Sequence, residues 1–407
     1  MSTSISDTPG EILERILDFL HDDHPSLCSC CLVSREWLSA ARYHLVNPTI
    51  INEFQRPDRR YKDNLHSFLA LVQSPNSTIL FPIRKVVLNI ATLDLIKPVV
   101  DELRHSKSLN HVVFLDHSYL RDSPSLSWMA QAFPSVRNFS YSTIFAVRDE
   151  AYRLFASLPR LQDLAIYTEV YTNFMFPAQI PGPHFFHIST LRLRLLKSEQ
   201  FLDWLQTLDC WNSLLETLDL RIFRVLHRGW GPVKALNAFL RANSGTLRQL
   251  SLGIDYAPSV VDVDESYSVD NEEEPIDLSS LSNLRTVFFR THDINSISNS
   301  LMTLLPSSRL DVLSIHVLKW DYNPCDCVPS HLLERLARIM EDVNAFGGTA
   351  LNFRLSKIFG GSDLDFIRRL FGKGELGGGL KLSPVDFDED EDYQVDSYQA
   401  MCETLIA

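Results

Sequence analysis

The chain has 407 residues, of which 45% are hydrophobic and 22% charged, a composition typical of globular proteins with material for a sizeable core. Its formal net charge is −13, and no basic stripe of the kind that binds nucleic acid is present. Arg84, Lys85 and Lys97 interrupt the most apolar stretch, so we expect no membrane span. The polar N-terminus does not resemble a signal peptide, and we expect a cytoplasmic or nuclear protein.

The acidity of the chain is concentrated in two segments. Residues 262–277 hold eight acidic residues and residues 386–396 hold seven, with no basic residue in either. Without these fifteen, 36 acidic residues face 38 basic ones, so the rest of the chain is close to neutral. We interpret both segments as unfolded, because such composition buries too little apolar surface.

The cysteines do not form a disulfide or metal pattern. They are an odd number, seven, and they are scattered, which favours reduced thiols. The close sets lack the paired C-x-x-C spacing of a structural zinc site, so we expect neither a metal nor another cofactor.

The stretch from Thr8 to Tyr43 predicts three short helices. Thr8-Pro9-Gly10-Glu11 has the form of a capping box with proline at the first helical position. Apolar residues then recur at three- and four-residue steps and form one stripe: Ile12, Leu13, Ile16, Leu17 and Leu20. Leu27 to Val33 predicts a second helix covered by neighbours, and Ser34 is the expected N-cap of a third helix that contains Trp37.

The residues of this stretch resemble the F-box as it appears in large fungal F-box families. The resemblance lies in the Pro9-led helix, the run Leu32-Val33-Ser34-Arg35-Glu36-Trp37 and their separation, and it covers about a tenth of the chain. It implies docking onto a Skp-type adaptor that joins the subunit to a cullin-RING ubiquitin ligase. Thr8 stands where the family usually has leucine, and Ser34 stands where it often has cysteine.

The resemblance assigns six adaptor contacts, each on a matching position: Pro9, Ile12, Leu13, Leu32, Val33 and Trp37. The alternative is that such residues, together with Ile16 and Leu17, form the core of a three-helix bundle. About 40 residues are too few for a large core, so the same residues can serve both purposes.

Beyond a connector at 48–79 with one short helix at Leu65–Val72, an apolar triad of the form L-x-x-L-x-L recurs. It begins at Ile83, Leu109, Val136, Leu161, Ile188, Leu215, Leu247, Leu284 and Leu310, mostly 25 to 27 residues apart. Amphipathic stretches between triads predict helices at Leu93–His105, Glu150–Leu158, Glu199–Trp211, Val233–Ala242 and Ile297–Leu305.

A strand followed by a helix at this period is typical of leucine-rich repeats. We therefore predict an α/β chain: an F-box at 1–47, the connector, and a leucine-rich-repeat-like solenoid at 80–372, with its parallel sheet inside and helices outside. The acidic insert at 262–277 interrupts the solenoid, and a mostly disordered Gly-rich, then acidic tail fills 373–407. The Asn or Cys usual after each triad is missing, so the turns must satisfy their backbone groups differently, and an unrelated α/β layer fold is the alternative.

Residues between the triad's apolar positions are expected on the open, concave face, because strand side chains alternate. They are Lys85, Val87, His111, Asp163, Tyr167, Arg192, Arg194, Asp219, Arg221, Phe288, Arg290 and His316. Arginine pairs bidentately with carboxylate and phosphate. One hypothesis is that Arg192, Arg194, Arg221 and Arg290 bind an acidic or phosphorylated segment of a partner; the alternative is that these charges only confer solubility.

No nucleotide-binding, metalloprotease or nucleophile-elbow motif is present, so we expect no enzyme. The sequence favours a non-catalytic substrate-recognition subunit of an SCF-type (Skp–cullin–F-box) E3 ligase, with an unknown protein substrate. The alternative is a non-catalytic scaffold with a repeat domain and a vestigial F-box.

Overall fold

The structure of the chain is a computed structural model. It describes residues 9–20, 23–46, 49–52, 64–74, 80, 83–90, 93–116, 128–143, 149–168, 187–195, 202–203, 205–206, 214–224, 231–256, 275–291, 294–304, 310–317, 334, 338, 350–355 and 381–384. These residues fall into two compact units, with the division between Leu161 and Gln162.

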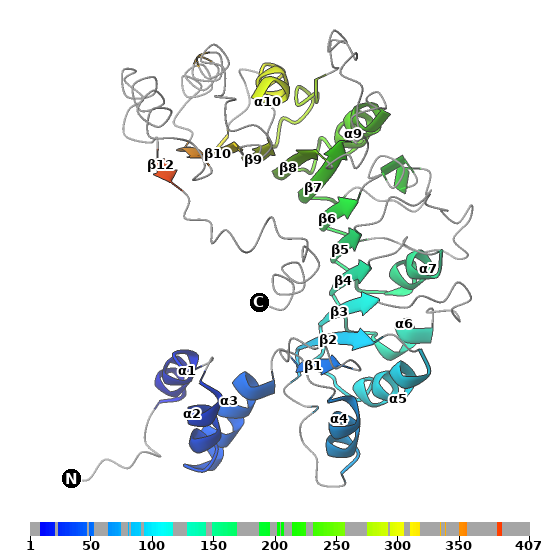
Figure 1. Cartoon of the computed structure of the whole chain (residues 1–407), viewed down its shortest axis with the longest axis vertical. Coiled ribbons are helices and arrows are strands. Elements are labelled where there is room, and N and C mark those ends of the chain that lie inside the picture. The colour runs from blue at the N-terminus through cyan, green and yellow to red at the C-terminus, as the bar shows by residue number, and fades with distance from the viewer. Residues whose placement is uncertain are drawn as a thin grey trace, which may run out of the picture. The chain divides into compact units, whose positions relative to one another are not determined.

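The first unit begins with three helices and continues with strands and helices in alternation. The helices are α1 (Gly10–Asp18), α2 (His24–Cys30) and α3 (Arg35–Val46). After them come β1 (Thr49–Asn52), α4 (Leu65–Val72), β2 (Lys85–Ile90), α5 (Leu93–Leu103), β3 (His111–Asp116), α6 (Trp128–Ala132), β4 (Asn138–Thr143) and α7 (Asp149–Ser157). Strands β1 to β4 pair in chain order, all parallel, with helices α5, α6 and α7 on one side of them (Figure 1).

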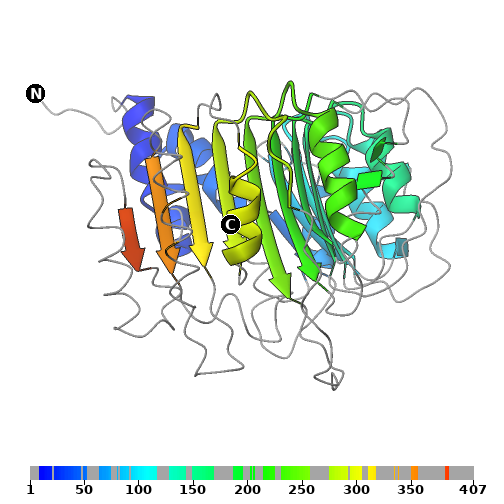
Figure 2. The same ribbon diagram turned by 90° about the horizontal axis from the view of Figure 1, so that it is seen from above.

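The second unit continues the same pattern. Its elements are β5 (Asp163–Thr168), β6 (Thr190–Leu195), β7 (Thr217–Arg224), α9 (Gly231–Ala242), β8 (Gln249–Tyr256), β9 (Thr286–Thr291), α10 (Ile294–Leu301), β10 (Val312–Val317), β11 (Ala350–Leu355) and β12 (Lys381–Pro384). Neighbouring strands are again parallel and in chain order, as the arrows in Figure 2 show. The predicted α/β class with a parallel sheet is confirmed.

The apolar triads explain this arrangement. From β2 to β10, every strand begins two residues after the predicted first triad residue, for example Lys85 after Ile83 and Thr217 after Leu215. All three apolar side chains of each triad are buried. Because these side chains point to the helix-covered side of the sheet, each repeat completes its core only against its neighbours.

Polar side chains just before several triads donate hydrogen bonds to the preceding repeat. Ser108 precedes the triad residue Leu109 and donates its Oγ hydrogen bond to the carbonyl of Ile83, 2.8 Å away, in the preceding repeat. Ser135 donates in the same way to the carbonyl of Leu109 at 2.7 Å. Asn283, which precedes Leu284, donates through Nδ2 to the carbonyl of Gly245 at 2.7 Å. The turns are therefore tied to the preceding repeat by side chains, as buried backbone oxygens require.

The predicted helices agree with the structure in most places. α4 has the predicted bounds, and α5, α7 and α9 begin and end within two residues of them, whereas α10 begins three residues before Ile297 and ends four before Leu305. Most of the helix expected at 199–211 lies outside the described residues. α6, with five residues, is too short to give a helical period and was not predicted.

Two short strands extend the sheet beyond the expected repeat region. β1 lies in the predicted connector and pairs with β2, and β12 lies beyond residue 372 and pairs with β11. Counted from the strand register, the triad positions that correspond to these strands are Val46, Thr49 and Ile51 for β1 and Gly377, Leu380 and Leu382 for β12. One position of each triad is not apolar, so the apolar pattern does not predict either strand.

The acidic insert ends earlier than expected. Residues 275–277 are folded, because the Asn237 side chain donates to the Pro275 carbonyl at 3.1 Å and accepts from the Asp277 backbone N–H at 2.8 Å. The Asp277 carboxylate also lies 3.5 Å from Arg241. The prediction of an unfolded segment is wrong for these residues, and 262–274 lie outside the described part of the chain.

Candidate functional site

The three N-terminal helices, residues 9–46, form a small bundle that we call the three-helix segment. Its core consists of one cluster, with Trp37 packed against it: Leu13, Leu17, Leu27, Cys30 and Ala41. Pro9 is the N-cap residue of α1, so the helix begins one residue later than predicted; the expected cap, Thr8, lies outside the described residues.

The apolar stripe of α1 is wider than this core. Leu13 and Leu17 are buried, at 5% and 0% exposure. Three further apolar residues, at helical steps of four and three, remain exposed: Ile12 at 47%, Ile16 at 39% and Phe19 at 89%. Since side chains at these steps lie on one face, α1 presents a second apolar face outside the core.

Two more apolar side chains are exposed in the turn between α2 and α3. Asp23 caps α2 by accepting from the Ser26 backbone N–H at 3.2 Å, and the Ser34 hydroxyl caps α3 by accepting from the Trp37 N–H at 3.3 Å. α2 begins at His24, three residues before the predicted Leu27, and ends at Cys30, three residues before the predicted Val33. The prediction that neighbours cover this helix is also wrong, because Cys28 is exposed, as are Leu32 (88%) and Val33 (49%) in the turn.

The six predicted adaptor contacts divide between the surface and the core. Pro9, Ile12, Leu32 and Val33 are exposed, whereas Leu13 belongs to the core and Trp37 is half-buried against it. Ile16 lies outside the core, although a core role was open for it. Phe19 was not predicted, yet its position seven residues after Ile12 on the same helical face was the available signal.

The second candidate surface is one face of the sheet in the second unit. We call it the open face; it carries the side chains that alternate with the buried triad residues of β5 to β10. Strand register arranges these residues in rows. One row runs through Ala165, Arg192, Asp219, Ser251, Phe288 and Ser314. The neighbouring row, which we call the arginine row, runs through Tyr167, Arg194, Arg221, Gly253, Arg290 and His316.

Two carboxylates of the open face interact within it, and a third acidic residue, Asp255, is at an alternating position of β8 opposite Phe223. Asp163 Oδ2 lies 3.1 Å from an Arg192 guanidinium nitrogen, and Asp219 Oδ1 accepts a hydrogen bond from the Ser251 hydroxyl at 2.8 Å. Burial raises the pKa of Asp163, and the positive charge of Arg192 partly counteracts that rise. The positive charge of Arg192 is thus paired with the Asp163 carboxylate inside the protein.

The arginine row contains no carboxylate between Tyr167 and His316. The Arg194 guanidinium lies over the Tyr167 ring, 5.4 Å from its centroid. On the next strand the Arg221 side chain leans the other way, over Gly253, where an added Cβ would stand 3.0 Å from Arg221 Cγ. Burial raises the pKa of the Tyr167 hydroxyl, and the charges of Arg194 and Arg192 oppose the rise. The phenol therefore stays neutral beside the guanidinium.

Three of the twelve predicted open-face residues are buried. Val87 is fully buried, and so is its register partner on β3, Val113, so this part of the face is not open in the first unit. Tyr167 (8%) and His316 (3%) are buried at the two ends of the arginine row. Lys85 is half-buried, and this burial lowers its pKa. The predicted face is therefore open mainly from β6 to β9.

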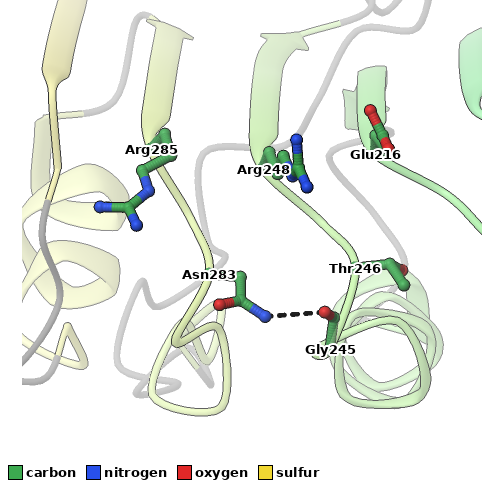
Figure 3. A pocket seen from close by; sticks show the side chains of 6 residues that line it. All are labelled: Glu216, Gly245, Thr246, Arg248, Asn283 and Arg285. Carbon is green, nitrogen blue, oxygen red and sulfur yellow. Dashed lines mark hydrogen bonds between the residues drawn. The ribbon is translucent and has the colours of Figure 1, made fainter.

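A recess of about 380 Å³ lies where β7, β8 and β9 begin. Its lining residues come from the turns that precede these strands: Glu216, Gly245, Thr246, Arg248, Asn283 and Arg285. Figure 3 shows the Asn283–Gly245 hydrogen bond across it and the Arg248 and Arg285 side chains above. Unlike the arginine row, the recess has a carboxylate, that of Glu216, beside its arginines.

Metal-binding and membrane-spanning features are not found in the described part of the chain. Within it, no group of three or more His, Cys, Asp or Glu side chains could hold a metal ion. Nor does any helix there combine the length and apolar composition needed to cross a bilayer. Cys28, Cys30 and Cys31 are free thiols, and the other four cysteines lie outside the described residues.

No protein-family model matches the chain, and no curated protein matches it at a significant level. The functional argument therefore depends on the two surfaces themselves.

Proposed function

We propose that the chain is the non-catalytic substrate-recognition subunit of an SCF-type ubiquitin ligase. In this proposal the three-helix segment is an F-box that binds a Skp-type adaptor, and the parallel-sheet region is a leucine-rich-repeat-like domain that holds a protein target. The observation that carries the proposal is the exposure of Ile12, Ile16, Phe19, Leu32 and Val33 on a segment of fewer than forty described residues.

Exposed apolar side chains gathered on a small bundle favour a protein-binding role. Large apolar residues scattered singly over a surface need no explanation, but a group of them marks an interaction site. Each side chain of this size gains about 1.5–3 kcal/mol when it is buried. A partner that covers several of them would bind with useful affinity, and the match of Leu32 and Val33 to the F-box pattern supports a Skp-type adaptor as that partner.

The repeat region supports the second half of the proposal. Nine triads, all buried and each with a strand that begins two residues after its first residue, favour stacked repeats with an extended sheet face in the second unit. Such a face suits a protein or peptide more than a small substrate. The mechanism is then proximity: the subunit raises the local concentration of a target lysine near the ubiquitin-carrying enzyme, in the cytoplasm or the nucleus.

The test is co-purification of the full chain with a recombinant Skp-type adaptor. The informative variant is Leu32→Asp with Val33→Asp, because both side chains are exposed and lie outside the core cluster. Its unfolding free energy should change by less than about 0.5 kcal/mol, as for most surface substitutions. Adaptor binding should fall more than about tenfold, since a charge would be buried at the interface.

A matched control introduces the same charges at exposed apolar residues of the second unit, Leu214→Asp with Met302→Asp. This control should keep adaptor binding. Leu13→Asp is unsuitable, because Leu13 belongs to the core and its loss would unfold the segment. If the native chain binds no adaptor, or if the control loses binding as fully as the Leu32/Val33 variant, the F-box proposal fails and the scaffold alternative is favoured.

A further inference from the structure

We infer that a face of the first unit is a docking site for residues 397–407 of the same chain, which we call the tail segment. The face belongs to β2, β3 and β4, on the side away from helices α5, α6 and α7, and we call it the first-unit face. The tail segment lies outside the described residues. Docking there closes the first-unit face to a partner until the tail segment is displaced, and the inference does not depend on the proposed adaptor binding.

The first-unit face is buried at its centre, although helices α5, α6 and α7 lie on the other side of the strands (Figure 1). Val87, Val113 and Ser140 are register partners on this face, and each is at most 5% exposed. Leu115 and Ser142, the next pair along β3 and β4, are at most 2% exposed. Strand side chains stand roughly perpendicular to the sheet, so burial this complete requires another layer over the face.

The equivalent positions of the second unit are not covered in this way. All but one of the residues in the corresponding row are half-buried there: Arg192, Asp219, Ser251, Phe288 and Ser314. The exception is Ala165, whose side chain is a single methyl group. The sheet by itself therefore leaves these positions partly exposed, and the cover is an addition in the first unit.

The main contacts of the described elements do not account for the cover. Those of β2 are with β1, β3 and α5, and those of β3 and β4 are with each other and with β2. Neighbouring strands lie in the plane of the sheet, and α5 lies on its other side (Figure 1). Of the longer undescribed stretches within the first unit, 53–63 has seven charged residues among eleven, and 117–127 connects β3 with α6 on the helix side. Neither stretch is well suited to cover valines.

The tail segment has the composition and the location for this role. Seven of its eleven residues are apolar and only Glu403 is charged, whereas the preceding residues 386–396 hold seven acidic residues. The division of the chain into compact units assigns Met401–Ala407 to the first unit, although residues 162–400 belong to the second. The tail segment therefore belongs with β2 to β4 and not with β12, the strand that precedes it in the chain.

The tail segment and the first-unit face also match in size. β2 to β4 span two strand spacings, about 10 Å, and a helix with its side chains is about 10–12 Å wide. Tyr398, Met401 and Leu405 recur at steps of three and four, so in a helix they would form one apolar face about 10 Å long. The small side chains of Ser140 and Ser142 leave room for such a helix to approach β4.

Covalent attachment means that the docking contact need not be strong. It gives the tail segment an effective concentration near the face of up to about the millimolar range, so a contact too weak to hold a separate peptide still keeps the face covered. A partner that presents its own apolar segment would compete with it. The contact therefore controls access to the first-unit face without a second protein.

The test measures how fast single introduced cysteines in the full chain react with N-ethylmaleimide, with each site read by peptide mass spectrometry. Ser140→Cys reports on the first-unit face, and Ser251→Cys reports on the equivalent row of the second unit. Ser140→Cys should react at least about tenfold more slowly than Ser251→Cys. Adding Leu405→Asp should remove this difference, because a carboxylate buried against valines would expel the tail segment.

The matched control, Gln399→Asp, adds the same charge on the opposite side of the expected helix and should retain the protection. Met401→Asp should act as Leu405→Asp does, and circular dichroism checks that each variant keeps its secondary structure. Equal reactivity of Ser140→Cys and Ser251→Cys would overturn the inference, as would protection that survives Leu405→Asp or is lost equally in Gln399→Asp.

Adaptor co-purification separates this inference from the proposed function. Leu405→Asp should keep the adaptor, because the tail segment is not part of the three-helix segment. Leu32→Asp with Val33→Asp should lose the adaptor and keep the protection of Ser140→Cys.

Discussion

The contact between Arg221 and Gly253 gives a prediction whose size follows from two opposing effects. In Gly253→Ala, the new Cβ would stand 3.0 Å from Arg221 Cγ and 3.6 Å from Arg221 Cβ and Cδ. Carbon atoms in comfortable contact are about 3.5–4.0 Å apart, so the Arg221 stem must move by about half an ångström. Forcing a side chain away from its preferred rotamer costs about 0.5–1.5 kcal/mol.

The opposing effect is the gain from removing glycine. A protein with glycine inside a strand is less stable than one with alanine at the same position by about 0.5–1 kcal/mol, because glycine loses more backbone freedom on folding. The two effects nearly cancel, so Gly253→Ala should leave the unfolding free energy almost unchanged in the native chain. In an Arg221→Ala background the contact is absent, and the same substitution should then stabilise the protein by the full 0.5–1 kcal/mol or so.

A double-mutant cycle by urea unfolding measures this difference directly. The coupling between residues 221 and 253 should be about 1 kcal/mol, the approximate cost of moving the Arg221 side chain. Equal stabilisation by Gly253→Ala in both backgrounds would show that Arg221 does not lie over Gly253, and the description of the arginine row would then be wrong.

Two further predictions concern the core of the three-helix segment and the buried carboxylate. Leu17→Ala should lower the unfolding free energy by about 2–5 kcal/mol, because Leu17 is fully buried. Ile16→Ala on the same helix should lower it by less than about 1 kcal/mol. Similar losses for both variants in urea unfolding would contradict the division of α1 into two apolar faces. Burial raises the pKa of Asp163 above its ordinary 3.8, so its stabilising contribution is complete below that value and is lost as pH rises through the folded pKa. The stability of Asp163→Asn relative to the native chain should therefore increase from acid to neutral pH, and a difference independent of pH would refute this.

The repeat pattern was predictable because it depends on apolar residues that recur at a regular step. Triad positions such as Ile83 and Leu215 must be apolar to be buried, and the step between them sets the strand positions to within a residue. Strands β1 and β12 were not predicted because one of the three triad positions of each is not apolar, Thr49 for β1 and Gly377 for β12. The hydrogen bonds from Ser108 and Ser135 were not predicted either. In the sequence both residues resemble ordinary loop serines, and their acceptors lie in the preceding repeat.

The candidate surfaces were predictable only in part. Periodicity placed Ile12, Leu13, Ile16 and Leu17 in one stripe, but it could not tell which half of the stripe the core would use. That depends on how α2 and α3 pack, and hence on the caps at Asp23 and Ser34. Likewise, alternation placed Arg192 on the open face, yet its pairing with Asp163 depends on side-chain geometry between neighbouring strands.

The hydrogen bonds between turns also limit how the length of such a chain can change during evolution. Ser108 donates to the carbonyl of Ile83 and Ser135 to that of Leu109, so these two turns take their acceptors from the repeat immediately before them. Duplication or loss of one complete repeat would join a serine to an equivalent carbonyl and leave no donor or acceptor behind. An insertion of half a repeat would break that match at both junctions. Natural variants of this protein should therefore differ in length by whole repeats or by loops at the sheet edge.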